Sequence, residues 1–127
     1  MSQLEILSSQ GAPAALGHYV QGMACGNLIM TSGQIALCPE SGELIKTPAA
    51  AMRQVLENLL AIVEAAGGKR ETIARVDIAV TGFDDWKLMN EAYTEFFGCH
   101  KPTRFVSSVA GLPAGATIEA SVLAFKA

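Results

Sequence analysis

The chain has 127 residues, of which 50% are hydrophobic and 17% charged, and its formal net charge is −3 at pH 7. This length suits a single domain over residues 1–127. The acidic balance argues against a nucleic-acid partner, because phosphate binding needs a clustered basic surface. No run of residues approaches the roughly 20 apolar residues of a membrane span, and the N-terminal residues lack the pattern of a secretory signal, so we expect a cytoplasmic protein.

The first two predicted strands form a hairpin. They are Tyr19–Gly22 and Leu28–Ser32, and Gly26-Asn27 between them is a turn signal of the hairpin kind. A loop rich in turn residues follows at 38–43.

The clearest helix begins at Pro48, because proline suits the first helical position and Thr47 can cap it. Gly67 suits the left-handed residue that ends a helix. Apolar residues recur between them at helical spacing and form one stripe: Met52, Val55, Leu59, Ile62 and Ala66. This pattern predicts an amphipathic helix that packs on a sheet.

A strand and a second helix come next. Val76–Thr81 alternates between apolar and polar residues as a half-buried strand does. Asp84 or Asp85 can then cap a helix of about a dozen residues that runs through Phe97 and is closed by Gly98.

Two strands end the chain, at Arg104–Val109 and Thr117–Phe125. The resulting order β-β-α-β-α-β-β predicts an α+β fold, with a mixed sheet and both helices on one face. Leu123 and Phe125 then fall on the other face of the sheet, and a partner subunit is the economical cover for them.

Two charges in these last strands are the candidate functional residues. Arg104 follows a proline by two residues, and Glu119 lies inside an apolar, strand-like run. A charge buried alone costs on the order of several kcal/mol. Arg104 and Glu119 therefore pair with each other, face solvent or bind a ligand. The three cysteines and two histidines lack metal-ligand spacing, so we predict no metal site.

A series of sequence blocks then points to one family. The blocks are Ala12–Gly22, Thr31–Ile35, Glu64–Gly67, Asn90–Phe97, Pro102–Arg104 and Ile118–Glu119. In this order they resemble the RidA (YjgF) family of reactive-intermediate deaminases over nearly the whole chain. The resemblance implies a chorismate-mutase-like fold and a homotrimer, whose three sheets line a central barrel and whose pockets lie in the clefts between subunits.

The resemblance also implies an enzyme. Members of this family hydrolyse enamine and imine intermediates such as 2-aminoacrylate, a small carboxylate, to a 2-keto acid and ammonia. Pyridoxal-phosphate enzymes release these intermediates, which damage such enzymes when left free, so the activity is a form of metabolite damage control. The resemblance implies no cofactor for the deaminase itself.

The resemblance further implies roles for individual residues. Arg104 has the planar fork that holds a carboxylate through two parallel hydrogen bonds. Glu119 would orient or deprotonate the attacking water, and Tyr19 would close the pocket from the neighbouring subunit. The other implied substrate-binding positions are Val106, through its backbone N–H, Gly33, Ser32 and Asn90.

Some positions depart from the family pattern. His18 replaces the proline before Tyr19, so the backbone angle φ is no longer fixed by a proline ring at that position. Val106 replaces a common cysteine, Phe105 is bulkier than the usual residue beside Arg104, and Ser107 replaces an apolar residue.

Two alternatives stay open at this stage. A non-catalytic trimer that binds 2-keto acids or acts as a chaperone-like surface would keep the need for Arg104 but make Glu119 dispensable. A ribonuclease or translation inhibitor is opposed by the acidic charge balance.

Overall fold

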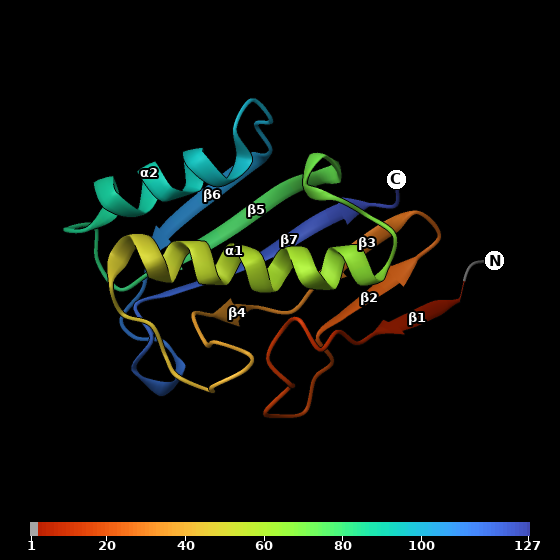
Figure 1. The fold of residues 1–127 in the computed structure, drawn as a ribbon, viewed down its shortest axis with the longest axis horizontal. Coiled ribbons are helices and arrows are strands. Elements are labelled where there is room, and N and C mark those ends of the chain that lie inside the picture. Colours follow the sequence, from red (N-terminus) through yellow and green to blue (C-terminus); the bar gives the residue numbers. More distant parts are fainter. Residues whose placement is uncertain (1–2) are drawn as a thin grey trace.

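The computed structural model describes residues 3–127, in which two α-helices cover one face of a mixed β-sheet (Figure 1). The strands are β1 (Leu4–Leu7), β2 (Gly22–Cys25), β3 (Leu28–Thr31), β4 (Gln34–Ile35), β5 (Ile73–Val80), β6 (Thr103–Ser108) and β7 (Ile118–Phe125). The helices are α1 (Pro48–Ala65) and α2 (Trp86–Phe97). This arrangement confirms the predicted α+β fold.

The sheet has the order β1-β2-β3-β7-β5-β6, and β4 pairs with β7 beside β3. Strands β5 and β6 are parallel, because α2 crosses over between them, and the other pairs are antiparallel. Within residues 3–127, neither helix is long and apolar enough to cross a membrane.

The first predicted strand is wrong in its position. The strand begins at Gly22, where the prediction has it end, and residues 17–19 form a bend before the sheet. The physical reason is the turn at Gly26-Asn27, because a two-residue hairpin turn must be flanked directly by paired residues. Cys25 and Leu28 are that pair.

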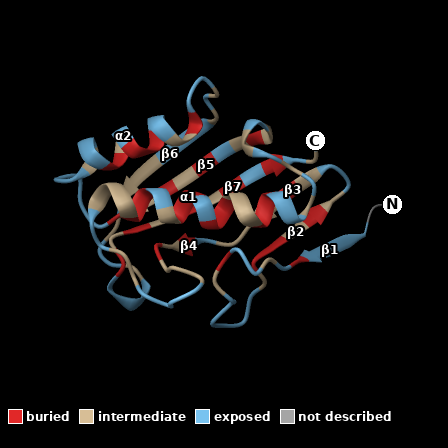
Figure 2. Ribbon diagram, viewed as in Figure 1, coloured by how far each residue is buried: buried red, intermediate tan, exposed pale blue. Residues whose placement is uncertain are grey.

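The predicted element order is also incomplete, since it lacks β1 and β4. Strand β1 is short and pairs only with β2, and most of its residues are exposed, as Figure 2 shows. Strand β4 has two residues. Strand β4 is too short to display the alternation from which a strand is predicted. Strand β1 is as long as β2 and β3, but a long loop and not a recognisable two-residue turn joins it to its partner.

The core lies between the helices and the sheet. The predicted stripe of α1 faces it, with Met52, Val55, Leu59 and Ile62 fully buried. Alternate residues of β5 and β7 supply the other side of the core. Thr47 and Asp85 take the N-cap positions, but neither side chain makes a capping hydrogen bond within the described chain. The predicted cap residues are therefore right in position and wrong in their hydrogen bonding.

The face of the sheet away from the helices, which we call the open face, carries exposed apolar side chains. Leu123 and Phe125 of β7 are 39% and 48% exposed, and they lie on this face as predicted. Leu4 and Ile6 of β1 also lie on the open face, as the pairing of β1 with β2 places them, and they are 61% and 68% exposed. An uncovered apolar face of this kind is typical of a protein–protein contact.

The buried amide of Gln21 anchors the loop before β2. Its Oε1 accepts a hydrogen bond from the Ser9 N–H at 2.7 Å, and its Nε2 donates to the carbonyl oxygen of Pro13 at 2.8 Å. The same Nε2 lies 3.1 Å and 3.3 Å from the carbonyl oxygens of Ser9 and Ala12. The Gln21 side chain thus provides hydrogen-bond partners for several backbone groups of this loop.

We predict that Gln21→Leu lowers the free energy of unfolding by about 2–4 kcal/mol, because the backbone groups of the loop lose their partner inside the protein. Urea denaturation measures the change. Gln10→Leu, at an exposed position, is the matched control and should leave stability within about 0.5 kcal/mol. Equal midpoints for the two variants would contradict the anchoring role.

Candidate functional site

Arg104 lies near the start of β6 and points toward the helix-covered face of the sheet. It pairs with Val76 of the adjacent strand β5, and Val76 is fully buried. Paired residues of adjacent strands share a face of the sheet. Its Nη1 donates a hydrogen bond to Oδ1 of Asn90 at 2.7 Å. Its Cζ lies 5.3 Å from the ring centroid of Trp86 and 4.8 Å from that of Tyr93. The predicted residues Arg104 and Asn90 are therefore in direct contact.

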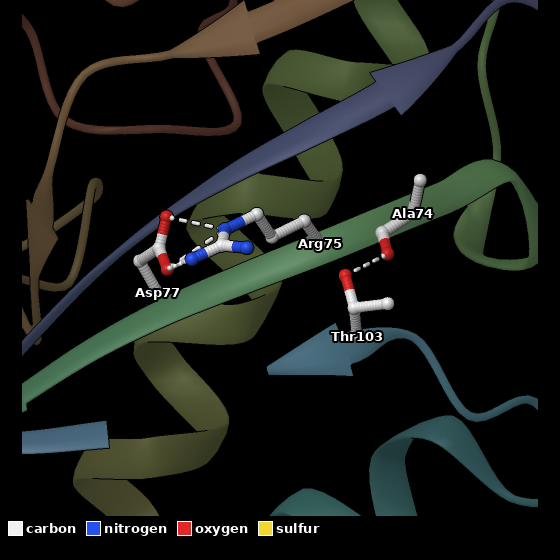
Figure 3. Close-up of polar contacts among 4 residues, drawn as sticks. All are labelled: Ala74, Arg75, Asp77 and Thr103. Carbon is white, nitrogen blue, oxygen red and sulfur yellow. Dashed lines mark hydrogen bonds and ion pairs between the residues drawn. The ribbon is translucent and has the colours of Figure 1, made fainter. Parts of the chain in front are cut away.

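The backbone at this point is tied to β5. Thr103 Oγ1 donates to the carbonyl oxygen of Ala74 at 2.7 Å, immediately beside Arg104 (Figure 3). Figure 3 also shows the neighbouring ion pair on β5, in which Arg75 Nη2 lies 2.9 Å from Asp77 Oδ1. This pair engages Arg75 and Asp77 with each other, whereas Arg104 makes no ion pair in the described part of the chain.

The backbone N–H of Val106 points to the free edge of the sheet. Strand β6 is the last in the sheet order, and the Val109 N–H donates to the Val80 carbonyl at 2.8 Å. Because peptide groups alternate in direction along a strand, Arg104 and Val106 direct their N–H groups away from β5. The Val106 side chain packs against the core on the side of the helices.

Arg104 lines a hollow of about 300 Å³ together with Asn90, Tyr93 and Lys101. Burial raises the pKa of the Tyr93 phenol to about 12, and the nearby Arg104 charge opposes this shift only in part. Tyr93 is therefore neutral near pH 7 and does not form an ion pair with Arg104.

Glu119 lies near the start of β7 and points to the open face. Its neighbours Ile118 and Ala120 are buried on the side of the helices, so alternation along the strand directs Glu119 away from them. It lines a cavity of about 450 Å³ and a smaller hollow of about 200 Å³.

The larger cavity brings together Tyr19, Ser32, Gly33 and Glu119, as well as Pro113 from the loop before β7. A β-carbon at Gly33 would lie 2.9 Å from Cδ and 3.2 Å from Oε2 of Glu119. The absence of a side chain at Gly33 is what lets the carboxylate lie against the backbone there.

Tyr19 and Ser32 are held by local hydrogen bonds. The Tyr19 hydroxyl accepts from the Leu16 N–H at 3.2 Å, which leaves its own proton free to be donated. Ser32 Oγ donates to the Val20 carbonyl at 2.7 Å, and the Ser32 N–H donates to the Gln21 carbonyl at 2.9 Å. Ser32 therefore ties the bend that carries Tyr19 to the end of β3.

The predicted site residues thus form two groups within one chain. Asn90, Arg104 and the N–H of Val106 form one, which we call the arginine group. The other, the glutamate group, consists of Tyr19, Ser32, Gly33 and Glu119. Arg104 and Glu119 lie on opposite faces of the sheet, and within residues 3–127 neither a hydrogen bond nor an ion pair joins them. The sequence left three possibilities for Arg104 and Glu119: to pair with each other, to face solvent or to bind a ligand. Pairing with each other within one chain is excluded.

Trp86 and Tyr93 were not predicted as site residues, although both contact Arg104. The sequence carries a signal for them, because Trp86, Asn90 and Tyr93 have the spacing i, i+4, i+7 of one helix face. Pro113 has no such signal, since a loop brings it to the cavity. Among the described residues, no three His, Cys, Asp or Glu side chains gather as metal ligands do.

Comparisons with known proteins place the chain in a family. Residues 9–126 match the family model described as Endoribonuclease L-PSP. The 2-iminobutanoate/2-iminopropanoate deaminase of Escherichia coli K12 is 42% identical in an alignment of 123 residues, and the alignment covers 94% of this chain and 96% of that protein. The chain belongs to the RidA/YjgF family. This confirms the family predicted from the sequence blocks.

Solved structures of the RidA/YjgF family agree with the fold. The YjgF gene product of E. coli has a TM-score of 0.93 at 40% identity, covering 97% of this chain and 99% of that one. E. coli TdcF with bound serine has the same TM-score at 38% identity and the same coverage. The structure with serine is a family member that holds a small carboxylate.

For this family member, we predict that Gly33→Ala displaces the Glu119 carboxylate but changes the free energy of unfolding by less than about 1 kcal/mol. The clash falls on the end of a flexible side chain, which can move at low cost. A crystal structure and a urea titration of the variant test this. Gly111→Ala, with nothing near its β-carbon, is the control. A Glu119 carboxylate in its original position, or a large loss of stability, would contradict the prediction.

We predict a second measurable property, that folded Tyr93 stays protonated above pH 10. The unfolded chain loses this proton near the ordinary pKa of about 10, whereas the folded chain keeps it until about pH 12. Between these values the unfolded state binds fewer protons, so stability falls as the pH rises. Tyr19→Phe leaves Tyr93 as the only tyrosine, and its tyrosinate absorbance gives the pKa. A midpoint near 10 in the folded protein would contradict the burial effect.

Proposed function

We propose that this chain hydrolyses 2-imino acids, and the 2-aminoacrylate-type enamines that tautomerise to them, to 2-keto acids and ammonia. The reaction takes place in sites shared between the subunits of a homotrimer. One observation carries the proposal: the arginine group and the glutamate group have complementary chemistry but lie on opposite faces of one sheet. They can face one ligand only across a contact between two copies.

The open face supports this assembly. Its exposed apolar residues on β1 and β7 need a cover, and β2 and β3 add Met23 and Met30 between them. Three such faces packed around an axis would bury this surface and place the free edge of β6 from one subunit beside the next subunit. A homotrimer with a central barrel would therefore also bring the two groups together.

The arginine group suits the carboxylate of the substrate. Asn90 engages Nη1 of Arg104, so the edge formed by Nε and Nη2 is left for two parallel hydrogen bonds to a carboxylate. The N–H of Val106 on the same strand edge can donate a third. A relative's structure contains serine, which carries its carboxylate next to a nitrogen-bearing carbon as a 2-imino acid does. This supports a small substrate of that kind.

The glutamate group suits the activation of water. With the carboxylate held by Arg104, Glu119 of the neighbouring subunit takes a proton from water, and the water oxygen forms a bond to C2 as the C=N π electrons move to nitrogen. Glu119 then returns the proton to nitrogen in the resulting carbinolamine. Glu119 next takes the proton of the carbinolamine hydroxyl and delivers it to the nitrogen. The C–N bond then breaks with its electron pair going to nitrogen, so that ammonia leaves and the keto group forms. Positioning and one general base, worth about 10²–10⁴-fold, supply this chemistry.

Tyr19 would cover the reacting carbon, with its hydroxyl proton available to a water or to the departing nitrogen. Ser32 would hold the bend that carries Tyr19, and Gly33 would admit the Glu119 carboxylate. Tyr19 would therefore act on the reacting atoms, whereas Ser32 and Gly33 would position Tyr19 and Glu119. A cytoplasmic location, expected from the sequence, would place the protein beside the pyridoxal-phosphate enzymes that release such intermediates.

The description of the family model as an endoribonuclease finds little support in this chain. Its formal net charge is −3, whereas binding of a phosphate backbone needs clustered basic residues. The proposal therefore concerns a small anionic substrate and not RNA.

The first test is ammonia release from 2-aminoacrylate generated by a dehydratase, with the background of the generating enzyme subtracted. Wild type should accelerate release, and Arg104→Ala and Glu119→Gln should each lose at least about 100-fold in kcat/KM. Keto-acid binding that survives in wild type without turnover would instead indicate the non-catalytic module.

Mixed trimers then test the sharing of sites. If Arg104→Ala and Glu119→Gln chains are unfolded and refolded together in equal amounts, about one quarter of the sites combine an intact Arg104 with an intact Glu119. Activity should return to about that fraction of wild type. Mixing Arg104→Ala with a chain that carries both substitutions is the control, and it should restore nothing. Absence of recovery in the first mixture would refute a site between subunits.

A further inference from the structure

The guanidinium of Arg104 lies against one face of α2. Three residues of that face contact it: Trp86 and Tyr93 through their rings, with centroids 5.3 Å and 4.8 Å from Cζ, and Asn90 through its amide oxygen at 2.7 Å. We infer that Trp86 and Tyr93 are positioning residues, whose rings hold the guanidinium of Arg104 so that its Nε–Nη2 edge is presented to the substrate. The inference rests on the proposed function, in which that edge binds a carboxylate.

The contacts are of a kind that fixes a cation without neutralising it. An acidic partner would compete with the substrate carboxylate, as the Asp77 carboxylate does for Arg75 through contacts at 2.9–3.1 Å. Aromatic faces and an amide oxygen attract the guanidinium but carry no net charge. Within residues 3–127, no Asp or Glu forms an ion pair with Arg104. Its charge is therefore available to a ligand.

Arg104 also needs such support, because its side chain is exposed. A free arginine side chain samples many rotamers, and ordering them on binding weakens affinity. Rings that restrict it beforehand reduce this loss. The expected signature is a change in KM, with kcat little changed, since the chemistry at C2 depends on Glu119.

Tyr93 contributes its ring and not its hydroxyl. The hydroxyl is buried and has no hydrogen-bond partner among the described residues, so it does not bind Arg104 or Asn90. Burial raises the pKa of this phenol to about 12, which keeps the ring partner uncharged. A phenolate at this position would form an ion pair with Arg104 and would compete with the substrate carboxylate for the guanidinium.

Packing alone could also account for aromatic residues on α2, and the helix offers a matched control for this. Phe96 holds the guanidinium of Arg70 in a similar contact, with Cζ 4.7 Å from the ring centroid. Phe96 is half-buried like Trp86 and packs against the same core. Its cation contact within residues 3–127 is with Arg70, whereas the cation contacts of Arg104 are with Trp86 and Tyr93. Like Trp86→Leu, the variant Phe96→Leu removes a packed aromatic ring that contacts an arginine. Because that arginine is Arg70, the variant leaves the contacts of Arg104 in place.

The kinetic test compares Trp86→Leu, Trp86→Phe and Phe96→Leu with wild type, each checked for folding by circular dichroism. Trp86→Leu should raise KM about 3- to 10-fold and leave kcat within about 2-fold. Trp86→Phe keeps a weaker π face and should give an intermediate KM, whereas Phe96→Leu should leave KM unchanged. A KM for Trp86→Leu equal to wild type, or an equal rise in Phe96→Leu, would overturn the inference.

A second test needs no turnover. In wild type, ring currents should shift the nuclear magnetic resonance signal of the Arg104 Nε–H group, which is assigned by its loss in Arg104→Ala. The shift should decrease in Trp86→Leu and persist in Phe96→Leu. An inactive wild type with the shifted signal would reject the proposed function, and with it the purpose inferred for the rings, although the rings would still hold Arg104. An active wild type with an unshifted signal would reject the inference alone.

Discussion

Side chains along a β-strand alternate between the two faces of the sheet, and this two-residue period separates the two charges of the site. Arg104 pairs with buried Val76 and so points toward the helices, whereas Glu119 pairs with Ala79 and points to the open face. A slip of one residue in either strand would reverse the face of every side chain on it. The register that buries the core thus also keeps Arg104 and Glu119 apart within a chain, so chemistry that needs both depends on assembly.

Helix α2 serves the core and the arginine group at once. Met89 and Phe97 are buried beneath it, while Trp86, Asn90 and Tyr93 reach Arg104. Both sets follow from the 3.6-residue repeat, because the stripe that faces the sheet is wide enough to reach the strand at its edge. The arginine group is therefore held by the same packing that stabilises the fold, and it does not depend on a flexible loop.

Long, regular patterns made most of this fold predictable, and short or irregular segments did not. The alternation in β5 and β7 and the stripe of α1 are confirmed because each spans enough residues to show its period. Strand β4 is too short for that, and β1 is not joined to β2 by a recognisable turn. The bend that carries Tyr19 was predicted as a strand, but its backbone hydrogen bonds are not those of a strand pair. The Tyr19 N–H donates to the Gly17 carbonyl, and the Val20 carbonyl accepts from the Ser32 side chain. The sequence blocks predicted the candidate residues but not their separation into two groups, which depends on strand pairing.

The departures from the family pattern bear unequally on the two groups. Val106 turns its side chain to the core, and the N–H that faces the free edge is the same for valine as for cysteine. Phe105, by contrast, is 60% exposed on the open face and shares a hollow of about 200 Å³ with Gly33 and Glu119. His18 lies beside Tyr19 on a neighbouring cavity wall. Under the proposed function, these departures would leave the carboxylate contacts of the arginine group unchanged. They lie around Glu119 and Tyr19, where they would bear on the side chain of the substrate.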